Sequence, residues 1–300
     1  MKGTMVRACL SMMAVALLSL GGICEAAVRC VNPAGSGGCF TSIQAAINAS
    51  SRKDTVEVFA GTYVENISIT KDSLLVMAVD EPCSVKILSN TGMTVTFASG
   101  SNYARLVGFL IEAGGGSGIY CNSVVSVQIR NCVVRNCIDY GIFFNNGILT
   151  AYNNIIEGNT LHGFYFSVEP QYLYNNVIRD NPGCGIWAAW IPSTGVFYEN
   201  NVLWNNGTDV CVGNFYGIDN LYVDPLLEAC YLPQIGSPCI DLGHEGDLNL
   251  DCDGSRNDIG IYGGPSAYCG PGPVVTSLQL VPATVVKGGT FNIQATGATR

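Results

Sequence analysis

Short stretches of alternating residues recur along the middle of the chain. The sequences GIYC, GIFF, GFYF and GIWA begin at Gly118, Gly141, Gly163 and Gly185. Alternation with a period of two is typical of β-strands that turn one face to a core. No helical pattern accompanies these stretches, so this part of the chain predicts short strands separated by turns.

Asparagines repeat with the same period. A first asparagine stands at Asn131, Asn154, Asn176 and Asn201, and a second follows five positions later at Asn136, Asn159, Asn181 and Asn206. The spacings of the first set are 23, 22 and 25 residues, and Gly108 and Ala113 fit one earlier turn. A β repeat this short cannot bury its apolar face alone, so successive coils must stack as a solenoid with parallel strands. Asn side chains in equivalent turns can then hydrogen-bond along a ladder, which indicates a structural role.

The alternating stretches separate two sets of side chains. One set is predicted to fill the core: Ile119, Cys121, Ile142, Phe144, Phe164, Phe166, Ile186 and Ala188. The other set is predicted to form an outer column with one aromatic ring per coil: Tyr120, Phe143, Tyr165 and Trp187. Exposed rings at this spacing suit stacking against sugar rings, so the column is a candidate polysaccharide-binding surface. Two alternatives stay open: a loop near Pro170 or Pro192 covers the column, or the rings only stack on one another.

A short helix is predicted near the N-terminus. Thr41 and Gln44 have the spacing of a capping box, and Ile43, Ala46 and Ile47 place one apolar face on the helix that follows. An open solenoid end exposes core side chains, so this face is expected to cover it.

The first 26 residues have the layout of a secretory signal peptide. Lys2 and Arg7 precede an apolar run from Ala8 to about Ile23, and cleavage is expected after Ala26. The alternative is a membrane anchor, but the run is shorter than the roughly 20 residues that a spanning helix needs.

Cysteine usage agrees with export. Removal of Cys9 and Cys24 with the signal peptide reduces 14 cysteines to twelve, an even number that suits disulfides in an oxidising compartment. The plausible bridges join Cys30 with Cys39, Cys230 with Cys239, and Cys252 with Cys269, although spacing does not determine connectivity. A zinc site is disfavoured because the chain has no CxxC motif and only two histidines.

Composition limits the class of partner. With 48% hydrophobic and 12% charged residues over 300 positions, the chain can bury a large core. A net charge of −9 argues against nucleic acid or an anionic membrane as the main partner.

An acidic segment near the C-terminus is a candidate calcium loop. Asn249, Asp251 and Asp253 alternate and are followed by Gly254, which matches the first half of a calcium-binding turn. The twelfth position is Gly260 and not a bidentate Glu, so Asp247 or Asp258 must complete the site. The alternative is a solvated turn held by a disulfide of the intervening cysteine.

The sequence resembles the right-handed parallel β-helix proteins of the pectate-lyase-like superfamily from about Val28 to Gly264. TSIQAAIN and the segment Asp54–Ile69 resemble the first coil of that superfamily, which includes pectin methylesterases. The resemblance implies an all-β, right-handed parallel β-helix. The segments Asn220–Gly243 and Asp258–Gly264 resemble the end of secreted bacterial β-helix proteins that carry a C-terminal anchoring or sorting region. Ile261 and the two glycines after Tyr262 depart from that pattern.

The resemblance implies two kinds of catalytic chemistry, and neither is recognised in these residues. Superfamily lyases use a basic residue, often with calcium, and the hydrolases use paired carboxylates. Polar residues expected near the aromatic column are Arg135, Asp139, His162 and Arg179. A lone histidine beside a glycine turn is interpreted as a hydrogen-bonded turn residue.

These features predict an exported β-helix, residues 27–269, that binds extracellular polysaccharide through the aromatic column. The alternatives are a non-catalytic adhesion or structural surface module, and a polysaccharide lyase or hydrolase with an unrecognised site. Residues 270–273 are predicted to be a linker, and residues 274–300 the first strands of an incomplete immunoglobulin-like module.

Overall fold

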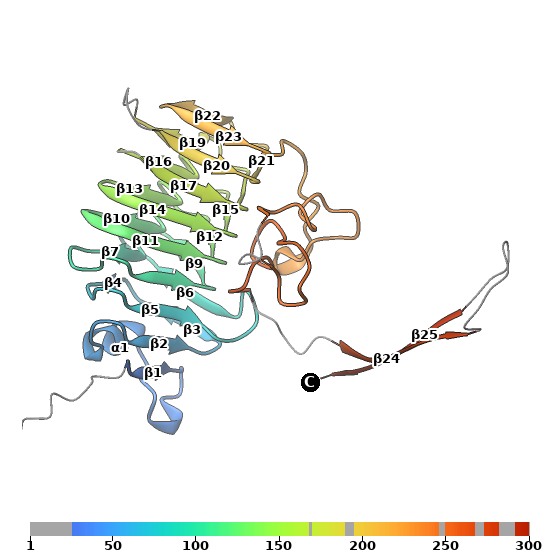
Figure 1. The fold of residues 1–300 in the computed structure, drawn as a ribbon. Helices are drawn as coiled ribbons and strands as arrows, with labels where there is room; N and C mark the ends of the chain where they lie inside the picture. The colour runs from blue at the N-terminus through green and yellow to red at the C-terminus, as the bar shows by residue number, and fades with distance from the viewer. Residues whose placement is uncertain are drawn as a thin grey trace, which may run out of the picture.

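The computed structural model describes residues 26–167, 170–189, 195–245 and 250–267, together with the backbone of two strands, 273–281 and 292–299. The predicted fold class is confirmed: the chain is an all-β, right-handed parallel β-helix (Figure 1). Seven complete coils each contribute one strand to each of three parallel sheets, with one further strand at either end of the first sheet.

The three sheets are named A, B and C in the order in which a coil passes through them. Sheet A has nine strands: β1 Val28–Val31, β2 Thr55–Val58, β5 Leu75–Ala78, β8 Arg105–Val107, β11 Val124–Arg130, β14 Gly147–Tyr152, β17 Gln171–Tyr174, β20 Val196–Glu199 and β23 Phe215–Ile218. Sheet B has seven: β3 Gly61–Val64, β6 Val85–Ser89, β9 Leu110–Ala113, β12 Val133–Arg135, β15 Ile155–Glu157, β18 Val177–Arg179 and β21 Val202–Trp204. Sheet C has seven: β4 Ile67–Ile69, β7 Val95–Phe97, β10 Ile119–Cys121, β13 Ile142–Phe144, β16 Phe164–Phe166, β19 Cys184–Ala188 and β22 Thr208–Val212.

The predicted inward-facing residues of sheet C fill the core. In β10, β13, β16 and β19 the first and third residues of IYC, IFF, FYF and IWA are fully buried, while the middle residue is half-buried on the outer face. Successive coils are in register, so Ile142 lies beside Ile119 and Phe164. Equivalent side chains therefore form rows along the solenoid axis.

The asparagine ladder is confirmed over its later coils. Asn154, Asn176 and Asn201 are buried, and the Nδ2 atom of each of the first two donates to the Oδ1 atom of the next at 2.9 Å. Asn220 extends this ladder, accepting from Asn201 at 3.0 Å. A second ladder joins Asn159, Asn181 and Asn206 in the same way.

The prediction was wrong by one residue at the first coil of each ladder. Cys132, and not Asn131, donates its backbone N–H to Asn154 Oδ1. Cys137, and not Asn136, stands at the equivalent place of the second ladder. Both asparagines have positive φ angles, 49° and 53°, and occupy the turn position just before the ladder. The shift explains why Asn131 and Asn154 are 23 residues apart, whereas the stacked residues Cys132 and Asn154 are 22 apart.

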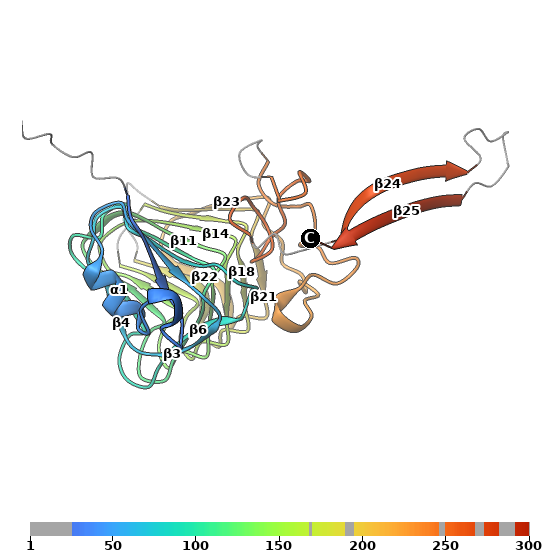
Figure 2. The ribbon, with the colours of Figure 1, turned by 90° about the horizontal axis from the view of Figure 1, so that it is seen from below.

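The N-terminal helix α1 (Ile43–Ala49) lies across the end of the solenoid, as predicted (Figure 2). Ile43, Ala46 and Ile47 are fully buried against the first coil. This face covers core side chains that the first coil would otherwise leave in water.

The cap of this helix differs from the prediction. The N-cap is Ser42 and not Thr41, because the Ser42 hydroxyl accepts the N–H of Ala45 at 3.2 Å. Glu65, from the coil beneath, accepts the backbone N–H groups of Ile43 and Gln44 at 2.8 and 3.1 Å. A carboxylate brought in by the fold therefore replaces the predicted local capping box.

The chain after the last coil folds back along the side of the solenoid (Figures 1 and 2). Residues 221–245 and 250–267, here the C-terminal cover, contain the short 3-10 helix η2 (Ala229–Tyr231); another, η1 (Ser36–Gly38), follows β1. The cover packs on an apolar row on the outer face of sheet B, formed by Leu110, Val133, Ile155, Val177 and Val202. Tyr231, Cys239, Ile259 and Ile261 supply its side of this contact.

The turn asparagines hold the cover in place. Asn131 Nδ2 donates to the carbonyls of Ile261 and Gly263 at 3.0 and 2.9 Å. One coil on, Asn153 Nδ2 donates to the carbonyl of Asp258 at 2.7 Å. The sequence pattern therefore contains two adjacent asparagine columns, one that faces the core and one that binds the cover.

Disulfides are present, but the predicted pairing was only partly right. Cys30–Cys39 is confirmed, and Cys252 is disulfide-bonded, with its predicted partner Cys269 outside the described residues. The predicted Cys230–Cys239 bridge is wrong, since both thiols are free. A bridge that spacing did not suggest joins Cys184 and Cys211 across β19 and β22.

The residues described at the two ends of the chain give little information about the predicted signal peptide and immunoglobulin-like module. The predicted signal peptide lies outside the described residues, apart from its last residue. Strands β24 (Pro273–Val281) and β25 (Asn292–Thr299) pair antiparallel, and the immunoglobulin-like module stays a prediction. None of the helices in the described residues is long and apolar enough to cross a bilayer.

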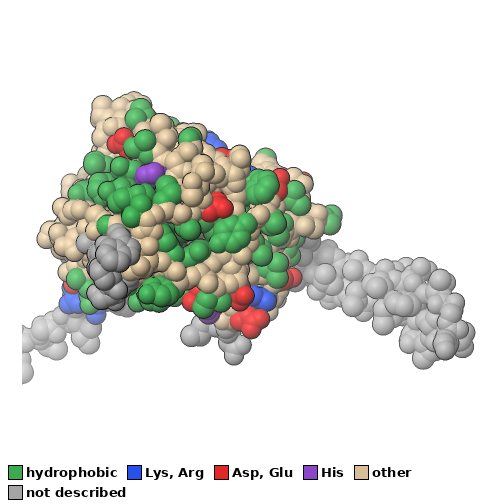
Figure 3. Space-filling view, turned by 90° about the horizontal axis from the view of Figure 1, so that it is seen from above, with side chains coloured by type: hydrophobic (Ala, Val, Ile, Leu, Met, Phe, Trp, Pro, Cys, Tyr) green, Lys and Arg blue, Asp and Glu red, His purple; other side chains and the backbone are tan. Residues whose placement is uncertain are grey.

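The far end of the solenoid has no helix across it in the described part of the chain. Figure 3 looks down on this end, where hydrophobic side chains form much of the visible surface. Val212, Tyr216 and Ile218, from β22 and β23, are more than half exposed, at 58%, 51% and 55%.

Candidate functional site

The predicted aromatic column exists as a row across sheet C. Tyr120, Phe143, Tyr165 and Trp187 occupy the same position of β10, β13, β16 and β19 and lie in register. Each ring is half-buried on the outer face. The parallel β-helix brings them together, because residues 22 or 23 positions apart in sequence become neighbours about 4.8 Å apart.

The rings of the column contact one another in two different ways. Tyr165 and Trp187 are parallel, with centroids 4.3 Å apart and planes at 4°. Phe143 is turned to 87° from Tyr165 at 5.0 Å, and to 57° from Tyr120 at 5.2 Å. Tyr165 and Trp187 therefore each cover one face of the other ring. The column is not a flat platform with four free ring faces.

Two neighbours widen this surface: His162, which the sequence analysis expected near the column, and Tyr140, which it did not name. Tyr140 packs on Tyr165 at 4.6 Å, and His162 stacks on Trp187 at 6.4 Å with planes at 10°. Both stand in the turns that lead into β13 and β16, two residues before the strand. Counting strand positions alone missed Tyr140, although it is the residue just before the repeat glycine Gly141.

His162 is a turn residue, as interpreted from the sequence. Its Nδ1 atom accepts the backbone N–H of Cys184 at 2.8 Å, which leaves Nε2 to carry the proton of the neutral ring. Burial lowers the pKa of His162. A neutral ring that organises the next coil does not need a catalytic role.

Arg135 and Arg179 do not lie beside the aromatic column, and that prediction was wrong. They project from sheet B, because a turn separates β12 and β18 from the strands of sheet C. Asp139, in contrast, directly precedes Tyr140 in the turn into β13.

On sheet B the two arginines belong to a row of alternating charge. Arg135 Nε donates to Glu112 at 2.7 Å, and Arg179 Nε donates to Glu157 at 2.8 Å. The hydroxyl of Tyr231, from the cover, donates to Glu157 and accepts from Arg135. Arg135, Glu157 and Arg179 border a cavity of about 330 Å³ together with Tyr231. Glu112 and Glu157 are each already paired with an arginine. Paired in this way, they hold the cover and do not resemble a free acid and base.

The candidate calcium residues are only partly described. Asp247 and Asn249 lie outside the described residues. Asp251 accepts backbone N–H groups of Asp258 and Gly264, and Asp253 accepts the N–H of Ser255 at 2.9 Å.

These contacts are hydrogen bonds within the acidic segment itself. Burial raises the pKa of Asp251 to about 6, despite its backbone donors. Asp258 Oδ1 accepts the N–H of Asp241 at 2.8 Å. The described part of the chain brings no three acidic, histidine or cysteine side chains together as a metal cluster.

Comparison with known proteins agrees with this architecture. The sequence model of a family described as the right handed beta helix region matches residues 84–225. A search of curated protein sequences finds no match. The chain therefore carries the β-helix that its resemblance to pectate-lyase-like proteins implied.

Solved structures with a similar fold include a pectate lyase and pectin methylesterases. Pectate lyase Pel9A has a TM-score of 0.49 and 17% identity over 66% of this chain, which spans 64% of the length of that enzyme. A deglycosylated pectin methylesterase from Aspergillus niger has a TM-score of 0.41 and 14% identity over 65% of this chain and 85% of the other. The carrot pectin methylesterase has a TM-score of 0.40 and 13% identity over 64% and 70%.

Proposed function

We propose that this protein is exported and binds extracellular polysaccharide through the aromatic column of sheet C. The observation that carries the proposal is the register of four aromatic side chains, one per coil, on a single outer face. Aromatic rings present large apolar surface at little cost in side-chain entropy, and they suit the apolar faces of sugar rings. The disulfides support export, since such bonds persist in oxidising compartments.

The ring geometry sharpens how a sugar chain would bind. Tyr165 and Trp187 stack on each other, so a sugar ring must use their outer edges, the hydroxyl and indole N–H included, or the face of each that the partner leaves free. Phe143, turned edge-on to Tyr165, offers an apolar surface in another direction. We infer that the ligand runs along the column and contacts several coils.

The test compares variants of two stacked aromatic columns. Tyr165→Ala and Trp187→Ala should each weaken binding to a polysaccharide identified on a glycan array by about twofold to thirteenfold, because a ring contact is worth about 0.5–1.5 kcal/mol. Phe197→Ala is the matched control, since Phe197 stacks between Tyr172 and Tyr216 on the outer face of sheet A. Equal binding by the wild type and both sheet C variants would eliminate the aromatic column as the site.

Calcium binding by Asn249, Asp251, Asp253 and Asp258 is a separate prediction. If an ion holds this turn, calcium should raise the melting temperature and a chelator should lower it, because a ligand of the folded state stabilises that state. Asp253→Asn should abolish the difference. A melting temperature that changes with neither calcium nor chelator would contradict calcium binding at this turn.

A further inference from the structure

A long groove follows the line where the C-terminal cover meets the outer face of sheet A. Four cavities of about 220, 270, 60 and 210 Å³ share lining residues from each to the next. We call this the seam groove. Its floor is formed by outward side chains of five adjacent strands, from Met77 on β5 to Tyr174 on β17, a length of about 19 Å at the usual strand spacing.

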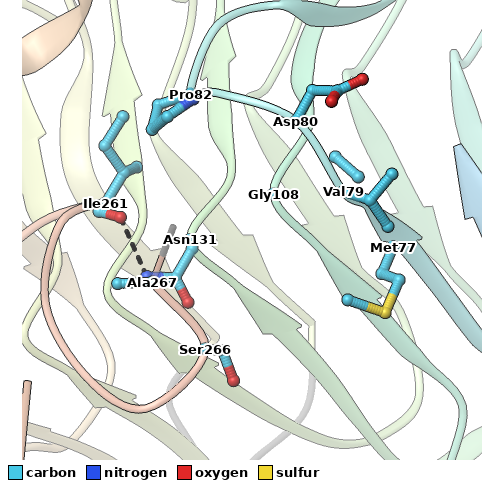
Figure 4. Close-up of a pocket in the computed structure, with 10 residues that line it drawn as sticks. Met77, Val79, Asp80, Pro82, Gly108, Asn131, Ile261, Ser266 and Ala267 are labelled. Atoms are coloured by element: carbon cyan, nitrogen blue, oxygen red, sulfur yellow. Dashed lines mark hydrogen bonds between the residues drawn. The ribbon is translucent and has the colours of Figure 1, made fainter. Parts of the chain in front are cut away.

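The cover supplies the opposite wall. Figure 4 shows the first of these cavities, with Met77 and Val79 on one side and Ser266 and Ala267 on the other. Asn131 fixes this wall by its hydrogen bond to the carbonyl of Ile261. The groove is therefore built by contacts that also hold the cover.

Two arginines without carboxylate partners lie in this groove. Among the described residues, every arginine except Arg105 and Arg130 forms an ion pair with a carboxylate; the paired ones are Arg29, Arg52, Arg135, Arg179 and Arg256. Arg105 and Arg130 both line the 270 Å³ cavity. The chain has a net charge of −9, yet this cavity gathers two arginines that have no carboxylate partner within the described ranges.

Arg130 packs against an aromatic ring and has a buried nitrogen that is unpaired within the described residues. It is half-buried, its Cζ atom lies 4.8 Å above the Tyr152 ring, and its Nε atom is buried without a hydrogen-bond partner in the described part of the chain. Burial lowers the pKa of Arg130, and the charge of Arg105 acts in the same direction. An anion would relieve both the repulsion and the unpaired charge.

The groove continues from the arginines over aromatic side chains. Tyr152 and Tyr174 stack at 5.2 Å with planes at 19°, and His244 of the cover packs edge-on to Tyr174 at 5.6 Å. The Nδ1 atom of His244 is likewise buried without a partner in the described residues. This surface suits a ring or chain attached to the anionic group.

We propose that the seam groove binds an elongated anionic ligand, whose carboxylate or sulfate group pairs with Arg130 and Arg105 and whose body lies along Tyr152 and Tyr174. This site is separate from the aromatic column of sheet C and does not depend on it. Nucleic acid does not fit, because two arginines neutralise too few phosphates in a chain of this net charge.

The test uses three dextrans that share one backbone: carboxymethyl dextran, dextran sulfate and neutral dextran. The wild-type protein should bind an acidic dextran and not the neutral one. Whichever acidic dextran binds with the higher affinity identifies the preferred group, carboxylate or sulfate. Arg130→Gln should weaken that binding by about tenfold or more, because hydrogen bonds to charged groups are the strong ones. Arg105→Gln should weaken it too.

Arg52→Gln is the matched control. It makes the same change of charge at an exposed site away from the groove, so affinity should stay unchanged. Arg105 is exposed, so its replacement leaves no buried group unpaired and should preserve the fold. Tyr165→Ala and Trp187→Ala should also retain acidic-dextran binding, which separates this result from that of the sheet C experiment.

The proposal would be overturned by no binding of either acidic dextran by the wild type, by equal affinity for all three dextrans, or by unchanged affinity in both Arg130→Gln and Arg105→Gln. An affinity that falls equally in Arg52→Gln would assign the effect to net charge and not to the groove, which also contradicts it.

Discussion

At the scale of single residues, asparagine has two roles at adjacent positions of one turn. Asn154 lies inside the ladder, where its side-chain amide accepts the N–H of Cys132 and donates to the carbonyl of Ile129 in the neighbouring coil. Asn153, just before it, has a φ of 55° and turns its amide outward to the cover. Asparagine suits both places because it tolerates the left-handed conformation and carries a donor and an acceptor.

Removing one ladder amide should be costly. Asn176 donates to Ala151 and Asn201 and accepts from the main chain and side chain of Asn154, all at 2.9–3.0 Å. Asn176→Ala leaves several buried groups unpaired, so we expect a loss of about 3 kcal/mol or more. The fall in the denaturation midpoint measures it.

Asn205→Ala is the control for that experiment. Asn205 is exposed, has a φ of 53° and makes one hydrogen bond, to Asp180. The change should cost about 1–2 kcal/mol of left-handed backbone strain. If both variants lose the same free energy of unfolding, the buried hydrogen bonds of the ladder do not stabilise the protein more than the exposed turn residue does.

At the scale of elements, the cover decides which outer faces of the solenoid are free. It buries the apolar row of sheet B and leaves the aromatic column of sheet C outside that contact.

Next to this contact, Cys230 of η2 lies against Cys83, which precedes β6, and both thiols line one cavity. Spacing suggested Cys239 as the partner of Cys230, but Cys239 is buried in the apolar contact.

We expect oxidation to join Cys83 and Cys230. Burial raises the pKa of Cys83 to about 12, so the exposed Cys230 thiolate attacks oxidised glutathione first and releases one glutathione thiol. Cys83 then displaces the second glutathione, and the two cysteines together lose two hydrogen atoms. Intact mass and peptide mapping detect the bond, and the melting temperature should rise because the unfolded chain is constrained.

Cys230→Ser should show neither change. A Cys230–Cys239 bond in the peptide map, or wild-type protein that stays fully reduced, would contradict the expected pairing.

At the scale of the whole molecule, the repeat alone determined the β-helix. Its alternating strands, its period near 22 and its need to stack are properties of a local pattern, and register along the axis follows directly from them. For this reason the core of sheet C and the outward aromatic column could be predicted from residue positions. The ring orientations could not, because each depends on the neighbouring coil.

Only the tertiary structure decided where residues without a common period meet. The cover brings Tyr231 to a pair of ions from two coils, Glu65 caps a helix from the coil beneath, and the seam groove gathers Arg130 beside the cover. The sequence by itself determined the solenoid and the sides its repeated residues face, because stacking repeats the same short-range geometry. The position of the C-terminal cover depends on contacts between residues more than one hundred positions apart in sequence, such as Asn131 with Ile261. No local pattern specifies such contacts. The tertiary structure therefore also decides which charged side chains beside the cover stay unpaired.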